Sequence, residues 1–378
     1  MSGVLPYGRQ SINADDIAAV NDVLRGDWLT TGPAVTAFEE RLRAFTGARS
    51  AVTVTSGTAA LHVAYAAAGV GPGRDVVTSP LTFVATASSA ALHGARVIFA
   101  DVEEDTGNLD ADAVGAVLTE TTRVVAAVDY AGHPAEMDAL HAVAQRVDAL
   151  LLEDAAHSIG STYHGRTVGT LADLTTFSFF PTKNLTTAEG GAVLSTDPNL
   201  GVRAARFHNI GLVRDRADLR YPDEGPWHQE VHEFGLNYRL PDVLCALGLS
   251  QLARMTAFKR RRAEIVARYD AGLADLPGVR IPARRPYVDP TWHLYPLRVL
   301  GGRRREVFHH MRAAGIGVQV NYLPVYWHPV FEDLGYRRGL CPNAERYYAE
   351  EISLPLFVDL ADAEQDRVID ALRRVIGH

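Results

Sequence analysis

The chain has 378 residues, of which 47% are hydrophobic and 22% charged, the composition of a globular protein rather than of a disordered chain. Its 45 acidic residues outnumber its 37 basic ones, and the resulting net charge of −8 argues against a nucleic-acid partner. No apolar run approaches the ~18–20 residues of a membrane span, the N-terminus lacks a signal-peptide layout, and the two cysteines have no CxxC spacing, so we expect a cytoplasmic protein without membrane contact or structural zinc.

The first 200 residues alternate between helix and strand patterns. Residues 34–45 form an amphipathic helical pattern, with Phe38 and Leu42 on its apolar face. Short apolar runs predict strands at 51–55, 76–79, 96–102, 123–130, 149–153, 174–179 and 192–195. Alanine-rich helices are predicted between them at 59–68, 83–93, 111–118 and 137–147. This alternation is typical of an α/β fold in which helices cover both faces of a mostly parallel sheet.

The pattern changes after Pro241. Apolar residues from Leu244 to Tyr269 recur at helical spacing and predict one long helix that ends near Gly272. The rest of the chain, with predicted strands near 292–299 and 317–322, indicates a smaller α+β unit. We therefore expect two domains, a large one of residues 1–245 with an N-terminal arm and a small one of residues 246–378.

Candidate binding residues follow the predicted strands, because ligands bind at the carboxyl ends of strands in an open α/β sheet. Residues 55–59, Thr-Ser-Gly-Thr-Ala, offer free backbone N–H groups at a helix start, and such groups suit a phosphate. The alternative is that this turn is simply an N-cap. Asp154 ends an apolar strand, where a buried carboxylate needs a partner such as a pyridinium nitrogen. The alternative is that Asp154 caps the next helix. Asn237 and Arg239 are anion donors or plain helix-start residues.

Lysine is rare in this sequence. Only Lys183 and Lys259 occur, and the other 35 basic residues are arginine. Lys259 lies on the predicted long helix beside three arginines, so we interpret it as a solvated charge. Lys183 lies in a loop after a strand, and a lysine amine can lose its proton and attack a carbonyl, which arginine cannot.

Three features together have the composition of a pyridoxal 5'-phosphate (PLP) site: Lys183, Asp154 about thirty residues upstream, and the phosphate cradle at 55–59. PLP requires a Schiff-base lysine, a carboxylate on its ring nitrogen and an anion-binding helix terminus. The sequence therefore predicts PLP as the cofactor, and it predicts no metal.

These motifs resemble those of the DegT-type PLP-dependent sugar-nucleotide aminotransferases over nearly the whole chain. The matching segments are 6–10, 27–32, 55–61, 82–86, 153–157, 177–183, 189–191 and 237–239. Further segments are similar to the UDP-4-amino-4,6-dideoxy-N-acetyl-beta-L-altrosamine transaminases of pseudaminic acid synthesis, at 128–132, 185–191, 317–322 and 352–355. The resemblance implies PLP-dependent transferase fold type I, the fold of aspartate aminotransferase.

The resemblance also implies roles for individual residues. Lys183 is expected to form the Schiff base and to carry the proton, Asp154 to pair with the ring nitrogen, and His157 to bind the phenolic oxygen. Phe83 is expected to stack on the ring. The residues expected to hold the phosphate within one subunit are Gly57, Thr58 and Ser178.

Residues just ahead of the predicted long helix and in the small domain are implied to complete the site. Asn237 is expected to reach the phosphate of the neighbouring subunit, which makes the active unit a homodimer with shared sites. Arg239 and Tyr322 are expected to bind the substrate, and Arg239 is the first candidate for its diphosphate.

The expected reaction converts a nucleotide-linked keto-deoxysugar to an amino sugar at C4, with glutamate as donor. The alternatives are a C3-keto sugar, a cyclitol or antibiotic precursor, and a non-catalytic PLP-binding regulator of the same fold. Two features depart from the family pattern: Phe180 stands where many relatives have His or Tyr, and segment 207–230 matches none of the family's motifs. If that segment lies over the site, it sets the substrate.

Overall fold

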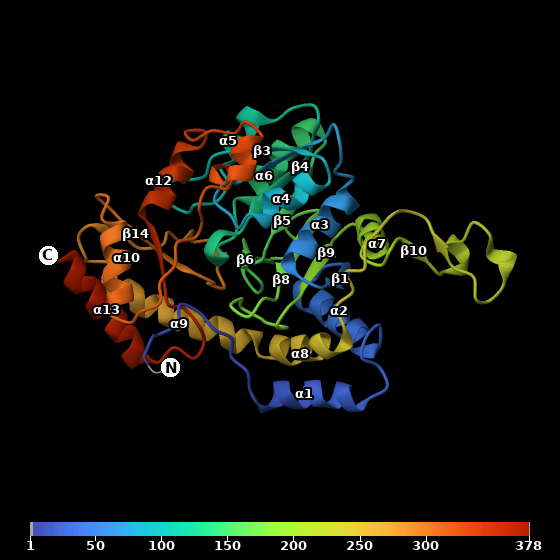
Figure 1. Cartoon of the computed structure of the whole chain (residues 1–378), viewed down its shortest axis with the longest axis horizontal. Helices are drawn as coiled ribbons and strands as arrows, with labels where there is room; N and C mark the ends of the chain where they lie inside the picture. The colour runs from blue at the N-terminus through green and yellow to red at the C-terminus, as the bar shows by residue number, and fades with distance from the viewer. Residues whose placement is uncertain (1–2, 378) are drawn as a thin grey trace.

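A seven-stranded sheet forms the centre of this computed structural model, which describes residues 3–377 (Figure 1). The strand order is β1-β9-β8-β5-β4-β2-β3; β9 is antiparallel to both neighbours, and the other adjacent pairs are parallel. The strands are β1 (Ser50–Val54), β2 (Asp75–Thr78), β3 (Arg96–Phe99), β4 (Thr122–Val128), β5 (Leu150–Asp154), β8 (Leu174–Ser178) and β9 (Gly191–Ser195). These match the predicted strands, and the mostly parallel α/β architecture is confirmed.

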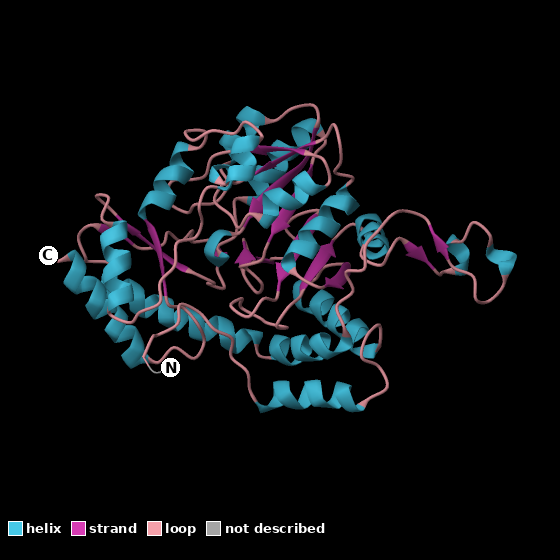
Figure 2. Cartoon of the chain, in the orientation of Figure 1, coloured by secondary structure: helices cyan, strands magenta, loops and turns pink. Residues whose placement is uncertain are grey.

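Helices cover both faces of this sheet (Figure 2). Successive strand residues divide between two hydrophobic cores, because side chains alternate across a strand. Val76 and Val124 belong to the core that contains α3 (Gly57–Ala68), whereas Val77 and Val125 belong to the core that contains α2 (Pro33–Thr46) and α6 (Met137–Ala144). The remaining helices before residue 210 are α1 (Ala14–Arg25), α4 (Ala85–Leu92), α5 (Ala111–Val117) and α7 (Pro198–Phe207).

The chain after residue 240 forms two helices and then a smaller α+β unit. The helices are α8 (Asp242–Ala253) and α9 (Met255–Leu273), and the antiparallel sheet has the order β12 (Val279–Arg280), β14 (Tyr295–Val299) and β15 (Glu351–Leu354). Around it lie α10 (Arg304–Ala313), α11 (Pro329–Asp333), α12 (Pro342–Glu350) and α13 (Asp362–Ile376). None of the helices within residues 3–377 is long and apolar enough to cross a membrane.

The prediction of one long helix is wrong, because Arg254 interrupts it between α8 and α9. The backbone N–H of Arg254 donates to Gln251 O, three residues back, at 3.0 Å, which breaks the regular α-helical ladder. Its guanidinium forms an ion pair with the buried Asp16 of α1 and lies 4.8 Å from the centre of the Phe258 ring. The helix therefore breaks at Arg254, the residue whose side chain binds the N-terminal helix α1.

The predicted strand at 317–322 does not form, and only isolated bridges occur there, between Ile316 and Leu5 and between Gln319 and Ser353. The backbone N–H of Asn321 is bound by a side chain instead, since it donates to Glu351 Oε2 at 2.7 Å. A side-chain acceptor from β15 thus takes the place of a ladder hydrogen bond at Asn321.

The interpretation of Lys259 as a solvated charge is also wrong. Its side chain is 21% exposed, and its ammonium donates to Gly160 O at 2.9 Å and to Asp289 O at 3.1 Å. It also pairs with Asp289 Oδ2 at 2.7 Å. Lys259 thus joins α9 to the junction where β13 (Val288–Asp289) pairs with β6 (Thr162–Tyr163), next to β7 (Arg166–Thr167).

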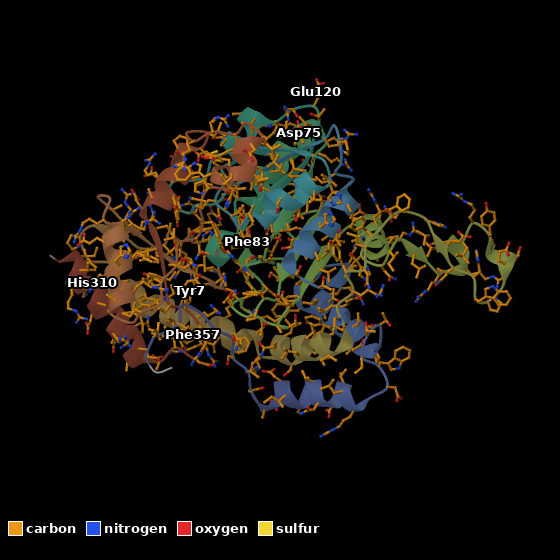
Figure 3. All side chains as sticks on the ribbon, in the orientation of Figure 1. Tyr7, Asp75, Phe83, Glu120, His310 and Phe357 are labelled. Carbon is orange, nitrogen blue, oxygen red and sulfur yellow. The ribbon has the colours of Figure 1, made fainter. Side chains whose placement is uncertain are left out.

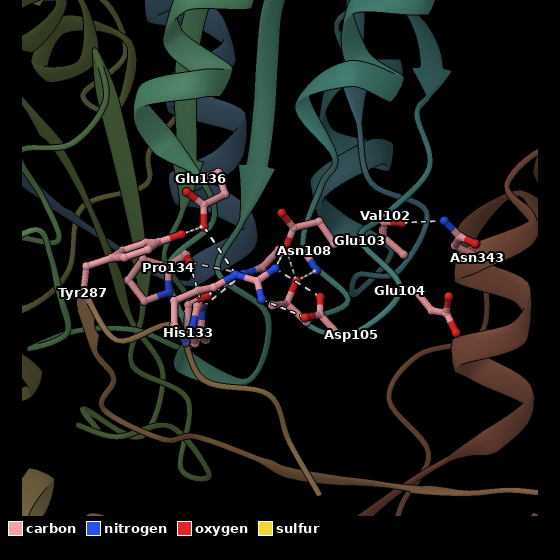
Figure 4. Close-up of polar contacts among 12 residues, drawn as sticks. Val102, Glu103, Glu104, Asp105, Asn108, His133, Pro134, Glu136, Tyr287 and Asn343 are labelled. Carbon is pink, nitrogen blue, oxygen red and sulfur yellow. Dashed lines mark hydrogen bonds and ion pairs between the residues drawn. The ribbon is translucent and has the colours of Figure 1, made fainter. Parts of the chain in front are cut away.

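A second polar cluster joins the loop after β3 to the segment that precedes β13 (Figure 4). Arg285 donates to Asp105 Oδ2 at 2.7 Å and to Glu103 Oε2 at 3.1 Å, and its backbone N–H donates to His133. In Figure 4 the Tyr287 hydroxyl points at Glu136, to whose Oε1 it donates at 2.5 Å. The carboxylates of Glu103 and Asp105 are therefore occupied by contacts within the protein.

Residues 209–237, named here the arm, leave the body of the molecule after α7 (Figure 1). The arm contains the two-stranded pair β10 (Leu212–Val213) and β11 (Glu230–Val231), and Figure 1 shows it extending away from the sheet. Its side chains Trp227 and Phe234 are 79% and 99% exposed. Most of the segment that departs from the family's motifs therefore lies on this projection and not over the sheet of its own chain.

Candidate active site

A cavity of about 390 Å³ lies at the carboxyl ends of β5 and β8, against the smaller C-terminal unit. The predicted site residues that line it are Gly57, Thr58, Phe83, Asp154, His157, Ser178, Lys183 and Tyr322. They come from the start of α3, the segment just before α4, the ends of β5 and β8, and three loops. The fold thus brings together eight residues that the sequence spreads over 266 positions, from 57 to 322.

Lys183 is held in a tight loop after β8. Its backbone N–H donates to Phe180 O at 2.9 Å, and the next residue, Asn184, donates to His157 O at 2.8 Å and to Thr291 O at 2.9 Å. Within residues 3–377, Lys183 Nζ makes no hydrogen bond or ion pair. Burial lowers the pKa of Lys183 to about 8, while the charge of Asp154 opposes this shift. About a tenth of the amine is therefore neutral at pH 7, far more than for a solvated lysine.

Asp154 ends β5 inside the protein, with 5% of its surface exposed. Its Oδ2 accepts the Thr86 hydroxyl at 2.7 Å and its Oδ1 accepts the Ala156 N–H at 3.3 Å. Burial raises the pKa of Asp154, and the charge of Lys183 opposes this. Residues 156–160 form turns, so the alternative that Asp154 caps a helix is wrong. A buried carboxyl without an ion-pair partner among the described residues fits a cationic ring nitrogen.

His157 is buried beside Lys183 and lies against two rings of the C-terminal unit. Its Nε2 is 3.1 Å from the Tyr322 hydroxyl, and its ring centre is 4.4 Å from that of His293. Burial, helped by the charge of Lys183, lowers the pKa of His157 well below its usual value, so the ring is neutral. Its Nδ1 is buried without a partner among the described residues. His157 is thus poised to hydrogen-bond a ligand oxygen.

The first turn of α3 forms an anion cradle with Ser178. Gly57 and Thr58 occupy the first helical positions, whose N–H groups have no intrahelical acceptor. A Cβ on Gly57 would lie 2.7 Å from Ser178 Cβ, so only glycine permits this close approach. The alternative that this turn is an N-cap is correct, since Ser56 Oγ accepts the Ala59 N–H at 3.0 Å, and phosphate binding by the same turn stays a prediction.

Phe83 and Tyr322 form one side of the cavity. Phe83 is 58% exposed at the start of α4, and its ring centre is 6.3 Å from that of Tyr322 in an edge-to-face arrangement. Figure 3 labels Phe83 and Tyr7 between the central sheet and the C-terminal unit. The exposed ring face at Phe83 leaves room for a flat ligand. With the unpartnered Lys183, the buried Asp154 and the cradle, the cavity fits PLP.

Asn237 and Arg239 do not line the cavity of their own chain. They lie at the root of the arm, where Asn237 bridges to Asn209 and the Arg239 backbone bridges to Val54. The Arg239 guanidinium donates to Asn209 Oδ1 at 2.7 Å.

Several lining residues were not predicted as site residues. They include Tyr7, Thr86, Gln319, Asn321 and His293. Thr86 lies in a segment that matched a family motif, so its contact with Asp154 could have been anticipated from that match. Tyr7, Gln319 and Asn321 also lie in segments that matched family motifs, at 6–10 and 317–322, whereas no motif, strand end or local spacing marks His293.

The comparisons with known proteins identify the family. The model of the DegT/DnrJ/EryC1/StrS aminotransferase family matches residues 10–373. The chain belongs to this family. The spore coat polysaccharide biosynthesis protein SpsC of Bacillus subtilis (strain 168) is 39% identical over 380 residues, which cover 98% of this chain and 97% of SpsC.

Solved structures agree with this membership. Spr1654 from Streptococcus pneumoniae, a candidate sugar aminotransferase, has a TM-score of 0.93 in its PMP form, with 31% identity and 99% of each chain covered. Its PLP form has a TM-score of 0.92 at 30% identity, with 99% of each chain covered. Helicobacter pylori PseC, an aminotransferase in the biosynthesis of pseudoaminic acid, has a TM-score of 0.92 at 28% identity, again with 99% of each chain covered.

Membership in the DegT/DnrJ/EryC1/StrS family confirms several predictions made from the sequence. It confirms fold type I, the transaminase reaction and the dependence on PLP that this family shares. It also confirms a sugar aminotransferase as the kind of enzyme.

Proposed function

We propose that this DegT-family enzyme transfers the amino group of glutamate to C4 of a nucleotide-linked keto-deoxysugar. The observation that carries the proposal is the unpartnered Lys183 Nζ, which faces the same cavity as the buried Asp154 and the Gly57–Ser178 cradle. The similarity to PseC supports a sugar acceptor of the type used in pseudoaminic acid synthesis.

PLP, when bound, supplies an electron sink for the electron pair that is left when the α-proton is removed. Lys183 is the base: its neutral amine takes that proton on Nζ and returns it to a carbon atom in the same half-reaction. A pKa near 8 suits this role, because the amine is both a usable base and a usable acid near neutral pH.

The other residues of the cavity bind and orient. The Asp154 carboxylate holds a proton on the ring nitrogen, and Thr86 fixes the carboxylate by its hydrogen bond at 2.7 Å. His157 hydrogen-bonds the phenolic oxygen, and Phe83 stacks on the ring. Gly57, Thr58 and Ser178 hold the phosphate with backbone N–H groups and a hydroxyl.

We infer that a second copy of the chain completes the site as a homodimer. Both proposed substrates are anionic, yet no arginine lines the cavity of the single chain. Asn237 would bind the phosphate in the neighbouring subunit, and Arg239 would bind the diphosphate of the sugar nucleotide. The exposed Trp227 and Phe234 of the arm support a partner surface, because large apolar side chains rarely stay fully solvated in monomers.

Turnover tests this function directly. Purified enzyme with glutamate and a panel of C3- and C4-keto-sugar nucleotides is expected to yield an amino sugar from a C4-keto substrate, detected by mass. Lys183→Ala is expected to abolish both the Schiff-base absorbance with PLP and the turnover. Wild-type turnover in that variant contradicts the assignment of the base. Turnover of C3-keto substrates alone contradicts the C4 position but not the reaction class.

A further inference from the structure

Behind the cavity wall lies a buried carboxyl group that transamination at Lys183 does not use. Glu351, the first residue of β15, has no exposed surface. Its Oε2 accepts the backbone N–H of Asn321 at 2.7 Å, and its Oε1 is hydrogen-bonded with the Ser353 hydroxyl. No lysine, arginine or histidine within residues 3–377 forms an ion pair with it.

The surroundings of Glu351 favour its neutral form. A buried carboxylate without a cationic partner is unstable relative to the protonated acid. The groups that act on it are mostly hydroxyls, together with the Asn321 backbone N–H, and the charged one among them is Arg304. The hydroxyl groups belong to Tyr7, Tyr130, Tyr322, Tyr347 and Ser353. Burial raises the pKa of Glu351 to about 8, so the acid is mostly protonated at neutral pH.

Glu351 helps to immobilise Asn321, which lines the cavity. The backbone N–H of Asn321 donates to Glu351, and its carbonyl accepts the Tyr130 hydroxyl at 2.5 Å. Its side-chain amide donates to Tyr7 Oη at 2.9 Å and to Ser353 Oγ at 3.0 Å. Both amide protons are thus used within the protein, and Asn321 Oδ1 has no partner among residues 3–377.

Tyr7 and Asn321 therefore present a neutral, polar wall to the cavity. Because the Tyr7 oxygen accepts a hydrogen bond from Asn321, its own proton is available to a ligand. Asn321 Oδ1 beside it offers an acceptor. One donor next to one acceptor, without a charge, complements a hydroxyl or amide group of a sugar. A carboxylate or diphosphate calls for cations instead.

We propose that Glu351 is a positioning residue that, as a neutral acid, fixes the wall of Tyr7 and Asn321 and thereby the binding of the sugar acceptor. The inference rests on the proposed function, because it assigns the wall to the keto sugar rather than to glutamate. An apolar residue at 351 would leave the Asn321 N–H buried without an acceptor, so the segment before Tyr322 would shift.

Two substitutions separate shape from hydrogen bonding. Glu351→Gln keeps the size, the neutrality and an acceptor for Asn321, whereas Glu351→Leu removes the acceptor. The two half-reactions are measured separately: glutamate is added to the PLP-loaded enzyme, and the keto sugar is added to the enzyme loaded with pyridoxamine phosphate, which carries the amino group. Glu351→Gln is expected to stay within about twofold of wild type in both. Glu351→Leu is expected to raise the KM for the keto sugar about tenfold, the loss of one hydrogen bond, with the glutamate half-reaction unchanged.

Tyr7→Phe tests the wall itself, and it decides the matter if Glu351→Leu does not fold. It removes the free donor and is expected to raise the same KM about tenfold with little change in kcat. Wild-type KM in Tyr7→Phe or in a folded Glu351→Leu overturns the proposal. If the wild type does not aminate the keto sugar while glutamate still reacts, the proposed function is contradicted. The role of Glu351 is then tested by the pH dependence of stability.

That measurement is the stability of the apo-protein against pH. The folded protein binds a proton at Glu351 that the unfolded chain releases above its ordinary pKa of about 4.3. Raising the pH from 5 to 8 therefore lowers the free energy of unfolding of the wild type relative to that of Glu351→Gln, which carries no such proton. The midpoint denaturant concentration of the wild type is expected to fall relative to that of Glu351→Gln over this range. Parallel pH profiles show that Glu351 is ionised, and they overturn its neutral role.

Discussion

Lys183 and Asp154 set each other's protonation state across the cavity. Burial lowers the pKa of Lys183 to about 8, and the negative charge of Asp154 keeps it from falling further. The amine is therefore protonated well below pH 8 and neutral above it. The rate at which the apo-protein takes up PLP, which needs the neutral amine, is expected to rise between pH 6 and 9 with a midpoint near 8.

Asp154→Asn provides the matched comparison for this midpoint. It removes the charge that favours the protonated lysine, so the midpoint is expected to move below that of the wild type. Thr86→Val is the control, since it deletes a hydrogen bond to Asp154 and no charge. Uptake is followed by the absorbance of the bound cofactor. A wild-type midpoint near 10, the value of a solvated lysine, contradicts the burial of Lys183.

At the scale of secondary-structure elements, Lys259 shows why a lysine is used where arginine dominates. Its ammonium has three donors, which reach Gly160 O, Asp289 O and Asp289 Oδ2 at 2.9, 3.1 and 2.7 Å. The planar guanidinium of arginine does not match three acceptors arranged around one point. Lys259→Met is expected to lower the free energy of unfolding by about 1 kcal/mol, a value reduced because Asp289 is largely exposed.

Urea unfolding measures this effect, and Lys259→Arg is the informative partner variant. It keeps the charge but not the geometry, so it is expected to recover less than half of the loss. Arg260→Met, on the exposed side of the same helix, serves as the control. Full recovery by arginine would mean that charge alone accounts for the role of Lys259.

Elements with a local periodicity were predictable from the sequence, and contacts between distant segments were not. The strands and helices around the sheet followed from apolar spacing, and strand ends pointed to Asp154, Ser178 and Lys183. The break at Arg254 coincides with an ion pair to Asp16, 238 positions away, and no window of neighbouring residues records that contact. Tyr7 and Asn321 are 314 positions apart and meet only in the folded protein, so local spacing does not reveal their contact either.

At the scale of the whole molecule, the hydrophobic core does not stop at the predicted domain boundary. One continuous core joins Val63 of α3 to Ile265 of α9 and Leu297 of β14. β13 of the C-terminal part also pairs with β6. The division at residues 245 and 246, which falls inside α8, stays a prediction. The cavity lies where the two parts meet, so their packing positions Tyr322 and Tyr7 against Lys183.

The arm leads to a prediction about assembly. If Asn237 completes the site of a neighbouring subunit, Lys183→Ala and Asn237→Asp damage different subunits of the same site. Each homodimer is expected to be inactive, because one lacks the base and the other places a carboxylate beside the cofactor phosphate. In a mixed dimer, the subunit with Lys183 intact receives an intact Asn237 from its partner, so one of the two sites is restored.

Equal amounts of the two variants, allowed to exchange subunits, are therefore expected to recover about one quarter of the wild-type activity, since half of the dimers are mixed. Sedimentation analysis of the same samples checks that the protein is dimeric. Trp227→Ala combined with Phe234→Ala is expected to shift it toward monomer, whereas Val330→Ala, an exposed apolar residue outside the arm, is not. Absence of recovery in mixtures that do exchange would show that Asn237 serves its own chain.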